Sequence, residues 1–167
     1  IKGRAFPESS VDVYIDAASA YEFASVSAHA ASIEGGTAEH DADLVKMEEL
    51  SAKILDSTLT FHMRGVGQGK VEEITAKAQE LYPNVEGEED PTWLKYYLCA
   101  LIASNIHKVT DKEGNEDVTE FTPEDVMQLR ETMPIDSWEI LIDTMQKLTL
   151  ASSYFDAVTD AGFLPKS

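Results

Sequence analysis

The chain has 167 residues, of which 43% are hydrophobic, and its 31 acidic and 13 basic residues give a formal net charge of −18. This length and apolar content suit one domain with its own core and exclude a disordered acidic tail. The charge argues against nucleic acid or an anionic membrane as a partner. It leaves open a solvated acidic surface, a basic or apolar partner, or a halotolerant surface.

The cysteine count and the apolar runs limit the chemistry further. Cys99 is the one cysteine, so an internal disulfide is excluded. It lies in the apolar run YYLCALIA, which predicts a small core residue rather than a nucleophile, in a reducing compartment. No apolar run approaches the ~20 residues that span a bilayer.

The N-terminal part predicts a strand followed by a helix. Residues 1–10 are expected to form a loose lead-in, and the alternation in VDVYI (11–15) predicts a short strand. Asp16 is placed to cap an alanine-rich helix over 17–33, which Gly35-Gly36 ends.

A second helix, a second strand and a third helix are predicted next. The second helix covers 38–56, and the alternating STLTFHMR (57–64) predicts a half-exposed strand. The third helix ends at Tyr82-Pro83. The apolar stripe expected on the second helix is Leu44, Met47, Leu50 and Ile54, and that on the third is Val71, Ile74, Ala78 and Leu81.

The second half predicts a buried helix, a short hairpin and two more helices. Residues 91–106 are apolar nearly all round, which indicates a central helix, and two extended arms surround a turn at 113–115. Thr122 and Asp125 form a capping-box pattern, and a further start follows at 134–136. The last helix is expected over 137–161, with a loose tail over 161–167. Its predicted core residues are Trp138, Leu141, Ile142, Met145, Leu148 and Phe155. The whole chain, 1–167, thus predicts one mostly helical α+β domain of five to six helices packed with a few short strands.

The segment GVGQGK resembles a phosphate loop, but the spacing fails. A dinucleotide-binding loop needs a third glycine where Lys70 stands, and a P-loop needs Ser or Thr where Val71 stands and glycine where Arg64 stands. We therefore expect Gly65, Gly67 and Gly69 only to join strand to helix through positive φ angles.

No other motif predicts chemistry. In DKEGNED the calcium-loop positions that should be Gly and Glu are Glu116 and Thr122. The four histidines (His29, His40, His62, His107) show no zinc-ligand spacing, and SSYFD lacks a nucleophile turn. We therefore predict no enzyme and name no catalytic, cofactor-binding or metal-binding residue.

Several segments, taken in order, form a recognisable pattern: VDVYIDAASAYEFASV, LSAKILDSTLTFHMRGVG, LYP, YYLCALIAS and FTPEDVMQLRETMPIDSWEIL. From about residue 11 to 150 the chain resembles the tail assembly chaperones of long-tailed phages that infect actinobacteria. The glycine step GVGQGK departs from the family, where a shorter small-residue–Gly–Arg turn is usual.

This resemblance implies a non-enzymatic protein of the host bacterial cytoplasm. Such chaperones bind the long helical tape measure protein and keep it soluble while tail tube subunits polymerise around it, and then leave. The implied partners are the tape measure protein and also the tail tube protein; a homo-oligomer stays open. An accessible apolar groove with charged rims would suit that role. The surfaces expected to bind are the small-residue helix 17–33 and any unburied part of the last helix beyond Leu150.

Two other functions remain as alternatives. One is a structural virion component, such as a minor tail or head–tail connector protein. The other is a nucleotide-binding enzyme that uses GVGQGK.

Overall fold

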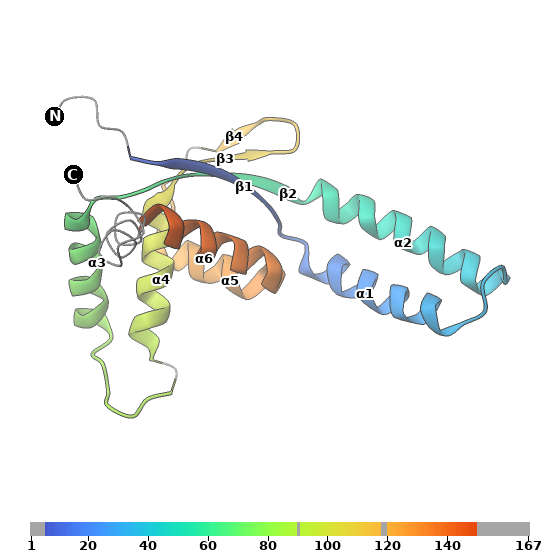
Figure 1. Cartoon of the computed structure of the whole chain (residues 1–167), viewed down its shortest axis with the longest axis horizontal. Helices are drawn as coiled ribbons and strands as arrows, with labels where there is room; N and C mark the ends of the chain where they lie inside the picture. Colours follow the sequence, from blue (N-terminus) through green and yellow to red (C-terminus); the bar gives the residue numbers. More distant parts are fainter. Residues whose placement is uncertain (1–5, 90, 118–119, 150–167) are drawn as a thin grey trace, which may run out of the picture.

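The computed structural model describes residues 6–89, 91–117 and 120–149, and over these residues the chain forms six helices and one four-stranded sheet. The mostly helical α+β class predicted above is confirmed (Figure 1). In chain order the elements are β1 Glu8–Tyr14, α1 Ala17–Ser32, α2 Ala38–Asp56, β2 Thr58–Arg64, α3 Gln68–Leu81, α4 Thr92–Asn105, β3 Ile106–Asp111, β4 Glu116–Asp117, α5 Pro123–Thr132 and α6 Ile135–Thr149.

The sheet has the order β1-β2-β3-β4, and every neighbouring pair is antiparallel. Phe61 is opposite Val11 on one side and Val109 on the other, so the side chains of these three residues share one face. Phe61 is fully buried and Val109 is 5% exposed, which makes this the inner face of the sheet.

β1 begins at Glu8, which corrects the expected lead-in over 1–10. Glu8 is opposite Arg64 in the ladder, and the Arg64 guanidinium lies 2.7 Å from the Glu8 carboxylate. Residues 8–10 (ESS) are all polar, so they show no apolar alternation that would predict a strand. Their backbone hydrogen bonds with β2 nevertheless hold them in the extended conformation, whatever their side chains.

The core lies between the inner face of the sheet and helices α3 to α6. As predicted, α4 is central, and it packs against α3, α5 and α6. α6 lies along β1, where the hydroxyl of the buried Ser137 accepts a 3.1 Å hydrogen bond from the backbone N–H of Tyr14. The largest fully buried apolar side chains of this body are Phe61, Met63, Ile102, Leu141, Met145, Val13 and Val126.

α1 and α2 form a helical hairpin that extends away from the rest of the molecule, at the end of the β1–β2 ribbon (Figure 1). Asp16 accepts a 2.9 Å bond from Ser19 N–H at the start of α1, and Thr37 caps α2 through His40 N–H. Gly36 has φ +82° in the connection between them, as the predicted helix end requires.

The glycine step differs from expectation in its backbone. None of Gly65, Gly67 and Gly69 has a positive φ, and Gly69 lies inside α3. Gly65 serves close packing instead: a Cβ there would lie 2.9 Å from the backbone oxygen of Leu148 and 3.3 Å from Pro7. The predicted continuation of the last helix through Phe155, and the tail over 161–167, lie outside the described residues.

Candidate interaction surface

In the glycine segment between β2 and α3, a backbone N–H and the lysine side chain interact with groups of the same chain. The Gly65 N–H donates to Pro7 O at 2.9 Å, and Lys70 Nζ lies 3.5 Å from the Glu73 carboxylate. Gly67 is the residue before α3, but it has no side chain to cap the helix. The geometry offers no feature beyond a helix N-terminus, which alone does not define an anion site.

The turn between β3 and β4 is built around Asp111. Its Oδ1 accepts 2.9 Å hydrogen bonds from the N–H groups of Glu113 and Asn115, and its Oδ2 accepts one from the Asn115 side chain. The Asn115 side-chain bond is the main cause that holds the pKa of Asp111 below its usual value. Both carboxylate oxygens thus stabilise the turn, whose Gly114 has φ +84°.

Cys99 and the histidines do not gather into a reactive or metal-binding group. Cys99 is 1% exposed, and burial raises the pKa of its thiol to about 11. His62 lies 2.9 Å from Ser10 and 3.0 Å from Thr110, so it links three strands on the outer face of the sheet. Within residues 6–89, 91–117 and 120–149, no three His, Cys, Asp or Glu side chains are placed to hold a metal ion.

A cavity of about 790 Å³ lies between α3, α4 and the segment that leads into α5. No pattern in the sequence indicates this cavity. Its lining mixes apolar side chains such as Ile74 and Phe121 with both Lys70 and Lys77 and with Glu73 and Glu80. It therefore does not present one sign of charge to a ligand.

The α1–α2 hairpin buries few of its side chains. Of its residues, Ser19, Ala30 and Leu50 are buried, while the other side chains are half-buried or exposed. Two helices that bury so little are marginally stable by themselves, because helix stability in water comes mainly from packing of an apolar face.

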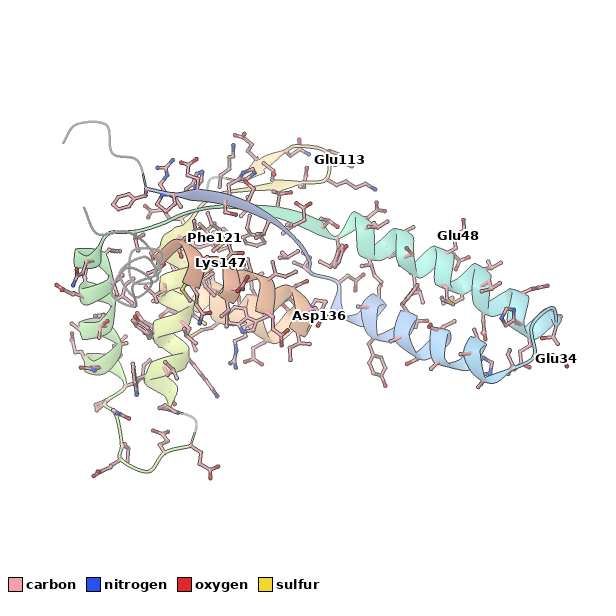
Figure 2. The ribbon with its side chains drawn as sticks, viewed as in Figure 1. Glu34, Glu48, Glu113, Phe121, Asp136 and Lys147 are labelled. Carbon is pink, nitrogen blue, oxygen red and sulfur yellow. The ribbon has the colours of Figure 1, made fainter. Side chains whose placement is uncertain are left out.

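One side of α2 turns away from α1 and carries apolar side chains around Glu48. We call Leu44, Val45, Glu48, Ala52 and Leu55 the outer face of α2; these positions recur every three or four residues and lie opposite the buried Leu50. The exposed fractions are 48% for Leu44, 58% for Val45 and 49% for Leu55. Figure 2 shows Glu48 directed away from α1.

Exposed side chains of the hairpin bear on two expectations. Leu44 was predicted to share an apolar stripe with Leu50, but it is 48% exposed. Within residues 6–89, 91–117 and 120–149, α1 is the one element that packs extensively against α2. The small-residue helix α1 was expected to bind, and Tyr21, 78% exposed, does lie on it; the larger exposed aliphatic group is nevertheless on α2. The adjacent apolar pair Ile54-Leu55 was the signal that α2 has a second apolar side, since Ile54 is half-buried and Leu55 is exposed.

The hairpin is strongly acidic. Residues 16–57 include nine carboxylates and two lysines. Lys46 lies 3.6 Å from Glu22 of α1, and Asp56 at the base of α2 pairs with Lys112 of the β3–β4 turn at 2.8 Å. Asp41, Glu48 and Glu49 are exposed beside or within the outer face, so an apolar surface is bordered by negative charge.

Comparison with protein-family models, with curated proteins and with solved structures finds no match to this chain. None of the helices over 6–89, 91–117 and 120–149 has the length and apolar content that crossing a bilayer requires. The surface that could lie beyond Leu150 is outside the described residues.

Proposed function

We propose that this chain is a non-enzymatic tail assembly chaperone of a long-tailed phage, which binds the tape measure protein in the host bacterial cytoplasm and keeps it soluble while the tail tube assembles. One observation carries the proposal: an extended helical hairpin with an exposed apolar face and an acidic border, the outer face of α2. Exposed apolar surface framed by charge is typical of a protein-binding site.

The shape of the molecule suits a client that is long and helical. The hairpin extends beyond the body (Figure 1), so a client helix can lie along α2 without meeting α3 to α6. The net charge of −18 disfavours self-association of the complex and keeps it soluble. Electrostatic attraction would also speed the encounter with a basic client.

Co-expression with the tape measure protein of the same phage tests the proposal. We expect the tape measure protein to move from the insoluble to the soluble fraction and to be recovered with this chain. A tape measure protein that stays insoluble contradicts the proposal.

Mass spectrometry of purified phage particles separates a chaperone from a structural component. A chaperone that leaves after assembly is absent from particles, whereas a minor tail or connector protein is present in fixed stoichiometry. Stoichiometric recovery in particles would replace the chaperone proposal with the structural one.

A further inference from the structure

We infer that the outer face of α2 binds a basic amphipathic helix, which packs beside α1–α2 as the third helix of a small bundle. The inference rests on the proposed function, because it names the chemistry of the client segment that this surface would hold. It commits to α2 as the binding helix and to a partner rich in lysine and arginine beside its apolar stripe.

Within the part of the chain that the structure describes, no third helix packs on the hairpin. α1 and α2 have 16 and 19 residues, yet Leu50 is the one large side chain fully buried between them. Leu44, Val45 and Leu55 remain about half exposed on the opposite side. A helix laid on that side would bury them and give α2 a core on both sides.

The apolar positions of the outer face lie along one side of α2. Leu44, Glu48, Ala52 and Leu55 follow the spacing of one helix face, and Ala52 leaves room at its centre. From Leu44 to Leu55 the face is roughly 16 Å long, about three helical turns. A partner helix with apolar residues at i, i+4, i+7 and i+11 presents one face of the same length.

The charge of the outer face favours a basic partner. Glu48 lies among the apolar residues of the face, and Asp41 and Glu49 lie beside it. A lysine or arginine on the partner would meet these carboxylates, whereas an acidic partner would be repelled. A second copy of this chain is such an acidic partner, because its own hairpin carries nine carboxylates against two lysines.

The test uses the full chain and two synthetic helical peptides of about 20 residues, long enough to cover the face. Both peptides carry leucine at i, i+4, i+7 and i+11; one has lysines beside the leucines and the other has glutamates. Fluorescence anisotropy at near-physiological salt measures binding. We expect the lysine peptide to bind at least about tenfold more tightly than the glutamate peptide, a difference of roughly 1.4 kcal/mol.

The deciding variant is Leu44→Glu/Leu55→Glu. The added negative charge strengthens any non-specific attraction of the lysine peptide, so weaker binding isolates the loss of apolar contact. We expect binding to weaken at least about tenfold. The control is Ile135→Glu, which adds one negative charge, half of that in the double variant, at a 71% exposed isoleucine on the body and should leave binding unchanged. Circular dichroism checks that each variant is folded.

A second variant keeps the inference testable if the double substitution fails to fold. Glu48→Lys reverses the charge at the centre of the face. It should weaken the binding of the lysine peptide and strengthen the binding of the glutamate peptide. Equal binding of both peptides to the unmodified chain, or a double variant that folds and binds as tightly as Ile135→Glu, would overturn the inference. A dimer of the free chain that Leu44→Glu/Leu55→Glu dissociates would assign the face to a second copy instead.

These outcomes are separable from the proposed function. The tape measure protein could be solubilised while the two peptides bind equally and the double variant binds like Ile135→Glu. In that case the chaperone function stands and the client lies on another surface. If the lysine peptide binds as described but the tape measure protein stays insoluble, the face binds a basic helix of a different partner.

Discussion

His29 Nδ1 on α1 lies 2.5 Å from Asp43 Oδ2 on α2, and His29 Nε2 lies 3.2 Å from the carboxylate of Glu39. The imidazole therefore connects the two helices toward the tip of the hairpin. The hydrogen bond with Asp43 is the main cause that raises the pKa of His29 above its ordinary value of 6.5, and the charges of Asp43 and Glu39 add to it. The helix C-terminus at α1 also favours the cation.

This arrangement predicts that the hairpin loosens as pH rises. Because the folded pKa of His29 is raised, the stabilising contribution is complete below pH 6.5 and is lost as pH rises through the folded pKa. Hydrogen exchange of the α1 and α2 amides, measured from below pH 6.5 to above pH 8 and corrected for intrinsic rates, should show protection falling over this range. His29→Gln should remove the pH dependence.

His107→Gln provides the control. Burial lowers the pKa of His107, and this residue lies on β3, away from the hairpin. It should not change the exchange of α1 and α2. Unchanged pH dependence in His29→Gln would show that another group connects the helices.

Alanine substitutions at Gly65 and at Gly69 should change the free energy of unfolding in opposite directions. At Gly65 the new Cβ would lie 2.9 Å from the backbone oxygen of Leu148, which cannot rotate away, so Gly65→Ala should cost about 1–3 kcal/mol of unfolding free energy. At Gly69, inside α3, nothing lies within 4 Å, and Gly69→Ala should stabilise by about 0.4–1 kcal/mol. Urea denaturation measures both; equal effects would contradict the assigned roles.

Asn105, at the end of α4, should be required for the full stability of the fold. Its side chain is fully buried, and its Nδ2 donates a 2.8 Å hydrogen bond to the backbone oxygen of Arg64. Asn105→Ala leaves that carbonyl without this donor, so we expect a loss of about 1–3 kcal/mol in urea denaturation. Asn84→Ala, at an exposed loop position, should stay within about 0.5 kcal/mol. A small effect at Asn105 would indicate that water replaces the amide.

Cys99 should be unreactive until the protein unfolds. With the pKa of its thiol raised to about 11, roughly a thousandth is thiolate at pH 8, and its sulfur is buried. A thiol-specific disulfide reagent should label it slowly in the native protein and rapidly in 6 M guanidinium chloride. Rapid native labelling would show that α4 opens far more readily than its packing indicates.

The helices and strands followed from local signals in the sequence. Thr122 and Asp125 were placed as a capping box, and both of its hydrogen bonds are present: Thr122 Oγ1 accepts from Asp125 N–H, and Asp125 Oδ2 accepts from Thr122 N–H. The bounds of α2 and the turn at Gly114 were predictable for the same reason, since cap and turn residues act on their own neighbours.

The candidate surface could not be predicted in this way. Whether Leu44 faces a core depends on what covers α2, and this is decided by where the β1–β2 ribbon places the hairpin. The role of Gly65 likewise depends on Leu148, which is distant in the chain. Patterns in α2 reveal that two sides are apolar, but tertiary packing decides which one is buried.

We propose that the outer face of α2 holds the client. The soluble fraction of the tape measure protein can be measured after co-expression with the unmodified chain, with Leu44→Glu/Leu55→Glu, or with Ile135→Glu. We expect the tape measure protein to be soluble with the unmodified chain and with Ile135→Glu, and to become insoluble with the double variant although that variant is folded. A tape measure protein that is equally soluble with all three chains would contradict the claim.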